Sequence, residues 1–331
     1  MAISKVVYGT TVLVDLTNDT VTSDKLLSGF TAHDKSGSVV TGTYIAFSPK
    51  LIVTAPIGSD VTCEKDGVVI TATEISGTWT FDIPSYGDWI ITSVLGSNTA
   101  TTTVNISAST ATLNYVNSVF SNNDWSAIAS SCKSGSVPST WAVGDSKSMT
   151  IDGVDYQIDI IGKNHDSYSD GGGVAPLTFQ MHTSFNTKYV MNSSSRDGNS
   201  WGGCLMRTAT LSSILNSMPI EVQNAIREVN KFTSEGANSS TISTTADKLF
   251  LLSEVEVLGT TTYSFSGEGS QYSYYSAGNS AIKTVNDSNY AWWLRSPRMN
   301  YDYQFCRINS SGSASSNNCT SEYGLSCAFC F

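Results

Sequence analysis

Residues 291–331 read AWWLRSPRMNYDYQFCRINSSGSASSNNCTSEYGLSCAFCF, and this stretch carries most of the information about fold and function. Apolar residues 292–294 and 328–329 enclose a segment that is crowded with Asn, Ser, Tyr and Asp. Tyr gives a large contact area at a low entropic cost, while Ser, Asn and Gly give adaptable hydrogen bonds. Buried polar groups need partners, so this composition favours a displayed binding surface over a packed core.

The enclosed segment supplies the candidate ligand-contact residues. Polar and apolar residues alternate over residues 305–309, which predicts a hairpin that turns at residues 310–312. Exposed Tyr and Phe side chains would form an apolar patch, which usually marks a contact surface; the alternative is an ordinary polar loop. Arg307 could bind a ligand or pair with Asp302. The predicted ligand-contact residues are Asn300, Tyr301, Asp302, Tyr303, Phe305, Arg307, Asn309, Ser311, Ser313, Ser315, Asn317, Asn318 and Tyr323. The predicted structural scaffold is Trp292, Trp293, Leu294 and Phe329.

The composition of the whole chain narrows the class of protein. The 331 residues are 40% hydrophobic and only 14% charged, and the net charge is -10. A polar but uncharged surface is typical of extracellular β-rich proteins, and the acidic balance argues against a nucleic-acid partner. Residues 1–8 show no secretory signal, and no run approaches the roughly 20 apolar residues of a membrane span. We therefore expect synthesis in the cytoplasm, no membrane insertion, and release by another route.

The chain divides into three parts, and the C-terminal stretch belongs to the third. Residues 1–44 predict a hairpin (VVYGTTVLVDL), a short helix over residues 25–27, and a strand after the turn HDKSG. About forty residues bury too little surface to be stable alone, so this part should need a partner. Residues 47–109 contain short β-branched strands separated by Gly turns, with alternation at Trp79 and Phe81, which predicts a β-sandwich spacer.

The third part, residues 111–331, reads as mixed α and β. A short helix is predicted over residues 211–218, and Pro219 is well placed to start a second helix that extends through Val229. The run LFLLSEVEVLG, residues 249–259, is a strand candidate, and residues 267–278 read as a long loop.

Three groups of residues invite a catalytic or metal-binding interpretation. His165 and Asp166 could act in acid–base chemistry, but a His beside an Asp is more often structural. Two carboxylates, Glu254 and Glu256, would share one face of a strand and could hydrolyse glycosides or simply be solvated.

The cysteines give a third, weaker signal. Cys327 and Cys330 form a CxxC among seven cysteines, but no second CxxC or His pair completes a zinc site. They are expected to be small buried hydrophobes. We expect no metal and no cofactor.

The third part resembles a C-type-lectin-like domain that is common in phage tail proteins and gut bacterial genomes. The resemblance covers most of residues 141–331, through WAVGDSKSMTIDGVDYQIDIIGKNHD, LTFQM, ADKLFLLSEVEVLG, YYSAGNSAIK and WWLRSP. In that family the segment after WLRSP is often the variable region of a diversity-generating retroelement, which implies a diversified ligand-binding face. The family usually ends in GVRPAF or GVAPAF, whereas this chain has GLSCAF, with Ser326 and Cys327 in place of the usual residues.

The other two parts resemble segments of the same class of proteins. DKLLSGFTAHDKSGSVVTGTY, in residues 24–44, resembles the N-terminal segment of phage tail fibres, and residues 47–109 are similar to Ig-like spacers. These resemblances imply a virion protein of the tail tip or tail fibre, usually a homotrimer. Residues 1–44 would contact other tail proteins and mediate oligomerisation.

The sequence therefore predicts a multidomain protein: a β-rich N-terminal segment, an Ig-like β-sandwich and an α+β C-type-lectin-like domain. The expected function is non-covalent recognition of a bacterial surface glycan or protein, and the protein is not expected to be an enzyme. Two alternatives stay open, namely a tail-borne glycan-degrading enzyme and a bacterial surface adhesin of fixed specificity.

Overall fold

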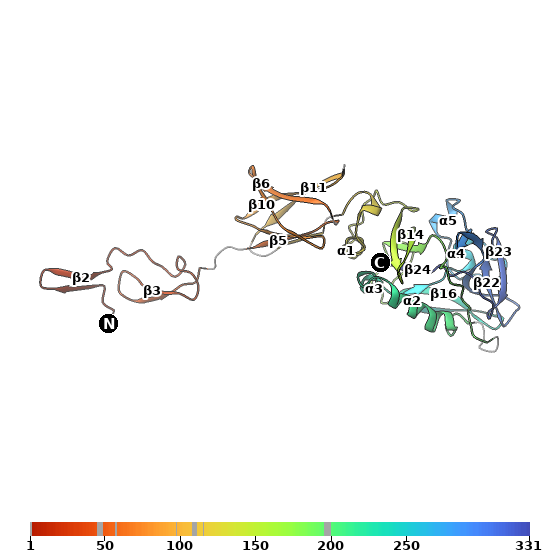
Figure 1. The fold of residues 1–331 in the computed structure, drawn as a ribbon. Helices are drawn as coiled ribbons and strands as arrows, with labels where there is room; N and C mark the ends of the chain where they lie inside the picture. The colour runs from red at the N-terminus through yellow and green to blue at the C-terminus, as the bar shows by residue number, and fades with distance from the viewer. Residues whose placement is uncertain are drawn as a thin grey trace.

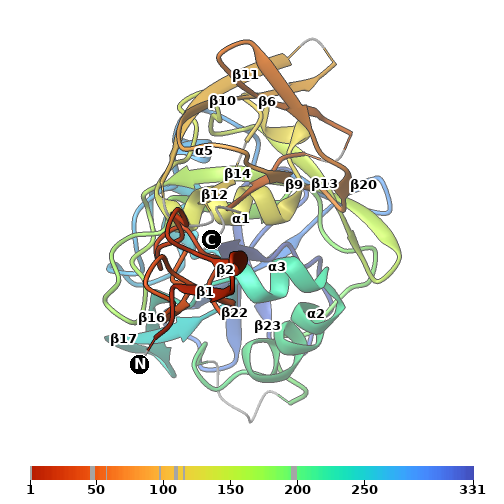
Figure 2. The ribbon, with the colours of Figure 1, turned by 90° about the vertical axis from the view of Figure 1, so that its left-hand side faces the viewer.

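The computed structural model describes residues 2–44, 49–56, 58–96, 98–107, 111–114, 116–194 and 200–331. The protein is β-rich, with 41% strand and 13% helix, and contains several antiparallel sheets. The few short helices all belong to the C-terminal part. Figure 1 shows the chain running from the N-terminal hairpins, through two sheets in the middle, to the larger C-terminal part. Figure 2 views the same arrangement from the N-terminal end.

The N-terminal part consists of two small hairpins. The predicted first hairpin is confirmed, with β1 (Lys5–Tyr8) antiparallel to β2 (Thr11–Asp15). The strand after HDKSG is also confirmed, as β4 (Val39–Thr41) paired with β3 (Thr31–His33).

The predicted helix over residues 25–27 is wrong. The amides of Lys25 and Leu26 donate to the Thr22 carbonyl, which makes one turn only. The chain then leaves the helical path, because the Ser28 amide donates to the distant Tyr44 carbonyl at 2.7 Å.

The middle part has two four-stranded sheets around one apolar core. One sheet has the order β11 (Asn98–Ile106), β10 (Gly87–Leu95), β6 (Asp60–Lys65), β7 (Val68–Thr71). The other has the order β12 (Ala111–Asn114), β5 (Lys50–Thr54), β9 (Thr78–Asp82), β8 (Glu74–Ile75). The predicted alternation is confirmed, because Trp79 and Phe81 from the second sheet meet Trp89 and Ile91 from the first in this core. β12 pairs in parallel with β5, so residues that the sequence places in the third part complete a sheet of the second.

The C-terminal part is built on a five-stranded sheet and a three-stranded sheet. The first has the order β13 (Ser146–Ile151), β14 (Val154–Lys163), β15 (Leu177–Met181), β24 (Ala328–Cys330), β18 (Leu249–Phe250). The second consists of β21 (Trp292–Pro297), β22 (Gln304–Ile308) and β23 (Ala314–Asn318). Two further hairpins pair β16 (Val229–Gly236) with β17 (Ser239–Asp247), and β19 (Lys283–Val285) with β20 (Ser288–Tyr290).

The helices agree in part with the sequence prediction. Those before β16 are the 3₁₀ turn η1 (Phe120–Asn122), α1 (Trp125–Ser134), the π-helical turn η2 (Met206–Thr210), α2 (Leu211–Ser217) and α3 (Ile220–Ala225). Pro219 is the residue before α3, with an extended ψ of 139°, and the helix ends well short of Val229, which begins β16.

The strand predicted over residues 249–259 is mostly wrong. Only β18 is a strand, and α4 (Glu254–Leu258) follows it. The Ser253 hydroxyl accepts a hydrogen bond from the Glu256 amide at 3.2 Å, and the Glu256 carboxylate accepts one from the Ser253 amide at 3.0 Å. This reciprocal capping box starts a helix, and Gly259, at φ 71°, ends it. The predicted loop at residues 267–278 also contains a short helix, α5 (Ser273–Ser276).

The large core of the C-terminal part contains the predicted scaffold residues. Trp292, Trp293, Leu294 and Phe329 are fully buried, as a scaffold role requires. The predicted C-terminal hairpin is confirmed, since β22 and β23 are antiparallel neighbours joined by a turn at Gly312 with φ 86°. This hairpin lies at the end of the molecule opposite the N-terminus (Figure 1).

Candidate functional site

The connection between β21 and β22 displays two of the predicted tyrosines. The guanidinium carbon of Arg298 lies 3.9 Å from the ring centre of Tyr301 and 5.1 Å from that of Tyr263. The rings of Tyr301 and Tyr303 meet edge to face at 6.2 Å. Both tyrosines stay more than a third exposed, at 37% and 38%. We call this group, Tyr263, Arg298, Tyr301 and Tyr303, the aromatic patch.

Backbone hydrogen bonds to distant segments hold this connection in place. The Met299 amide donates to the Tyr263 carbonyl at 2.7 Å, and the Asn300 amide donates to the Asn238 side chain at 2.8 Å. Asn300 has a positive φ of 66°, a conformation in which Asn is enriched. The predicted contact residue Asn300 therefore shapes the turn that presents Tyr301.

A second group of side chains lies around Arg307 of β22 and the segments beside it. The guanidinium carbon of Arg307 is 4.1 Å from the ring centre of Tyr323, and Lys188 Nζ is 4.2 Å from that of Tyr290. The two tyrosine rings are 6.2 Å apart. We call these four residues the cation–tyrosine row. The buried Trp293 supports it from below, edge-on to Tyr323 at 5.0 Å.

The β22–β23 register puts two more predicted residues on the face of this row. Cross-strand partners share one face of a sheet, so Ser315 lies beside Arg307. Asn317, two residues further, shares that face, and its amide donates to the Tyr323 hydroxyl. Lys188 and Tyr290 were not predicted, because they come from separate segments and no motif marks them. Arg298, which directly follows WLRSP, was not predicted either.

Other predicted contact residues build the hairpin. The Asn309 side-chain oxygen accepts hydrogen bonds from the Ser311 amide at 2.9 Å and the Ser313 amide at 3.0 Å, which closes the turn. The Asn318 side-chain oxygen accepts from the Thr320 amide at 3.1 Å in the same way.

Two of the expectations need correction or comment. Phe305 is fully buried, so its prediction as a contact residue is wrong; the apolar ring packs into the core of the C-terminal part. Asp302 is exposed, and among the described residues no ion pair joins it to Arg307.

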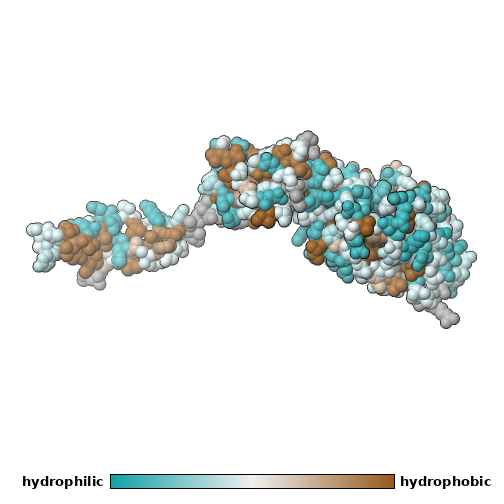
Figure 3. Space-filling model, viewed as in Figure 1, coloured by the Kyte–Doolittle hydropathy of each residue, from teal (hydrophilic) through white to brown (hydrophobic). Residues whose placement is uncertain are grey.

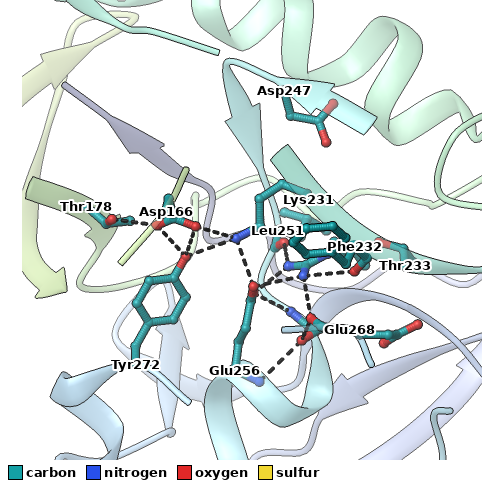
Figure 4. A network of polar contacts seen from close by, with 12 residues as sticks. Asp166, Thr178, Lys231, Phe232, Thr233, Asp247, Leu251, Glu256, Glu268 and Tyr272 are labelled. Atoms are coloured by element: carbon teal, nitrogen blue, oxygen red, sulfur yellow. Dashed lines mark hydrogen bonds and ion pairs between the residues drawn. The ribbon is translucent and has the colours of Figure 1, made fainter. Parts of the chain in front are cut away.

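The catalytic candidates Asp166 and Glu256 belong to a buried ion network. Lys231, with its side chain 2% exposed, lies 2.7 Å from Asp166 and 2.8 Å from Glu256. Arg295 forms two hydrogen bonds to the same Glu256 carboxylate, and the Tyr272 hydroxyl donates to Asp166 at 2.9 Å. Figure 4 shows Lys231 pointing between the two carboxylates.

The network stabilises the ionised forms of its two central carboxylates. Burial by itself would raise the pKa of Asp166, but the Lys231 ammonium and the Thr178 hydroxyl lower it to about 2. Burial opposes ionisation of Glu256 too, and Arg295 with Lys231 keeps its pKa below the ordinary value. By contrast, burial raises the pKa of Glu268 to about 7.

These contacts leave the carboxylates engaged by protein rather than presented to a substrate. The Glu254 carboxylate accepts from the Tyr263 amide at 2.9 Å and the Ser264 amide at 2.7 Å, and Glu254 is fully buried. Because Glu254 and Glu256 lie on helix α4, the shared strand face expected of them is wrong. His165 stacks on the Tyr272 ring, with centres 4.0 Å apart.

The cysteines are buried thiols, as expected. Cys327 and Cys330 are fully buried and free, and burial raises the pKa of Cys327 to about 12. Within the part of the chain that the structure describes, no three His, Cys, Asp or Glu side chains gather as a metal site would require. No helix among the described residues is long and apolar enough to cross a membrane.

Comparison with known proteins adds one finding. Residues 178–331 match the model of a family that is described as a domain of unknown function, DUF6273. No curated protein and no solved structure matches the chain. The matched segment includes the aromatic patch, the cation–tyrosine row and most of the ion network, whereas Asp166 lies before it.

Proposed function

We propose that the chain is a receptor-binding protein of a phage tail tip or tail fibre. It recognises a bacterial surface glycan or protein non-covalently through its C-terminal face. The observation that supports this most is the aromatic patch, where exposed Tyr301 and Tyr303 stand on a connection fixed by backbone hydrogen bonds. Rigid tyrosines give large contact area with little entropy to lose on binding.

The position of the hairpin in the molecule supports the same proposal. It lies at the far end from the N-terminus (Figure 1), so a chain attached through its N-terminal part would present the patch outward. As part of this proposal, the middle part is an Ig-like β-sandwich and the C-terminal part is a C-type-lectin-like domain. Two sheets around one core support the first assignment. The buried WWL segment beneath a polar hairpin supports the second and is compatible with a diversified face.

The proposal includes a homotrimer joined through residues 2–44. Every residue of β1 and β2 is exposed, and Figure 3 shows hydrophobic residues gathered on this part. Val6 pairs with Val14, and Val7 pairs with Val12 across a β-bulge, so two exposed apolar cross-strand pairs follow one another along the hairpin. Contact with other copies of the chain would cover these apolar pairs, and in a trimer each hairpin has two neighbours.

We propose no catalytic step. The carboxylates that would serve in glycan hydrolysis are buried and bound by protein groups, as Glu254 and Glu256 show. A general acid or base must come within hydrogen-bond reach of the substrate.

Binding of the labelled protein to a panel of whole bacterial cells tests the proposal. We expect saturable binding to at least one strain, and loss of that binding in the double variant Tyr301→Ala, Tyr303→Ala. Tyr86→Ala, an exposed tyrosine of the middle part, is the matched control and should bind as the original chain does. Binding that survives the double variant would contradict the assignment of the site.

A further inference from the structure

We propose that the cation–tyrosine row is a subsite for an acidic sugar of a bacterial surface glycan. The inference rests on the proposed function and names the chemical class of its ligand. It concerns a different group of side chains from the aromatic patch, and two of its members, Lys188 and Tyr290, lie outside the segment between Asn300 and Tyr323.

The first observation is that, among the described residues, no carboxylate pairs with either cation of the row. The ion pairs of the described residues involve other cations, and none includes Lys188 or Arg307. Acidic residues outnumber basic residues in the chain by 28 to 18, so carboxylates are not scarce. Within the described part of the protein, Arg307 Nε is also sheltered from solvent without a hydrogen-bond acceptor. The described part of the chain thus supplies a ring for the guanidinium but no anion.

The second observation is that aromatic rings hold both cations in place. Arg307 lies 4.1 Å from the Tyr323 ring centre and Lys188 lies 4.2 Å from that of Tyr290. Such stacking is attractive, and it reduces the freedom that a long side chain would lose when it binds a ligand. Two ordered cations at the ends of a tyrosine pair are arranged to meet anionic groups, which Arg and Lys bind through charge-assisted hydrogen bonds.

The neighbouring side chains favour a sugar over an acidic peptide. Ser315 shares the face of Arg307 and carries an uncharged hydroxyl. The Tyr323 hydroxyl accepts a hydrogen bond from the Asn317 amide and can donate its own hydrogen to a ligand. A sugar carries several hydroxyl groups beside its charge and can use all of these, whereas an acidic peptide side chain uses only the cations. The anion itself can be a carboxylate or a phosphate on the sugar, since both accept from Arg and Lys.

The test measures binding of the full chain to four polymers by biolayer interferometry. Polygalacturonate carries carboxylates, phosphomannan carries phosphates, dextran is a neutral glycan, and poly-L-glutamate is an acidic peptide. We expect binding to polygalacturonate or to phosphomannan, with the tighter of the two identifying the anion, and much weaker binding to dextran and poly-L-glutamate. Affinity should fall as salt is added, because salt screens exposed charges.

Substitutions then assign the binding to the row. Arg307→Gln and Lys188→Gln should each weaken binding to the acidic glycan about tenfold, as loss of a charge-assisted hydrogen bond implies. Lys133→Gln, which removes an exposed lysine at the end of α1, should have no effect. Circular dichroism should show that all three variants keep the fold.

Several results would overturn the inference. These are failure of both acidic glycans to bind, equal binding of dextran or poly-L-glutamate, and unchanged affinity in the Arg307 and Lys188 variants. The outcome is separable from the proposed function. If cells bind through Tyr301 and Tyr303 while the acidic glycans do not bind, only the present inference fails.

Discussion

The buried ion network offers a comparison between two aspartates only four residues apart. Asp166 lies 2.7 Å from Lys231 and its side chain is 3% exposed, whereas Asp170 lies 2.6 Å from Arg227 and its side chain is 62% exposed. Asp→Asn removes the charge and nearly preserves the shape. The two ion pairs have nearly the same length and differ in burial. A comparison of Asp166→Asn with Asp170→Asn therefore shows how much burial adds to the effect of an ion pair on stability.

The expected loss of stability in Asp166→Asn can be worked out from the structure in two ways. The pKa of Asp166 falls from 3.8 to about 2, and since one pKa unit is about 1.4 kcal/mol, ionisation stabilises the fold by about 2 kcal/mol. Removal of one partner of a buried pair costs roughly 3–5 kcal/mol, but Lys231 keeps Glu256 at 2.8 Å. We expect Asp166→Asn to lower the free energy of unfolding by about 2–4 kcal/mol, and Asp170→Asn to leave it nearly unchanged.

Hydrogen exchange of the β15 amides is the suitable assay, because it reports on the C-terminal part alone. A group whose pKa is depressed by folding stabilises the native state above its unfolded pKa and loses that effect as the pH falls. The difference between the original chain and Asp166→Asn should therefore shrink as the pH drops from about 4 to about 2. Equal losses in the Asp166 and Asp170 variants would refute the reasoning.

Three further outcomes are expected. Burial raises the pKa of Glu268 from 4.5 to about 7. The protonated Glu268 therefore stabilises the fold fully below pH 4.5, and this stabilisation is lost as the pH rises through 7. Glu268→Gln should make the free energy of unfolding in urea fall less between about pH 4.5 and about pH 8. Ser253→Ala removes the cap of α4 and should lower the free energy of unfolding by about 1–2 kcal/mol, measured in urea. Val7→Asp places a charge on the exposed hairpin and should convert the expected trimer to monomer in sedimentation velocity, whereas a monomeric original chain would contradict the trimer.

The strands of the middle part could be predicted because their signal is local. Alternation at Trp79 and Phe81 shows directly which side chains face the core. The run at residues 249–259 was ambiguous, since short apolar runs do not separate strand from helix. The signal that decides it is Ser253 followed three residues later by Glu256, which is the sequence pattern of a capping box.

The candidate site could be predicted only as a segment. The positions of Tyr301 and Tyr303 follow from the C-terminal stretch, but the burial of Phe305 depends on how the hairpin packs on the rest of the C-terminal part. The cation–tyrosine row joins Lys188 and Arg307 through three contacts, and the one between Lys188 and Tyr290 links segments that are far apart in the sequence. Such contacts are set by the tertiary fold, and no local pattern in one sequence encodes them.

The ion network and the displayed hairpin are linked through β21. Arg295 lies in the middle of this strand and bonds Glu256 from α4 and the Phe232 carbonyl from β16, while Arg298, three residues further on, already belongs to the aromatic patch. Apolar packing tolerates sliding, whereas a guanidinium held by several acceptors fixes position and direction. We therefore infer that the network fixes where β21 ends. The β21–β22 connection can then change its exposed side chains while its backbone starts from the same place, which is what the proposed diversified face would require.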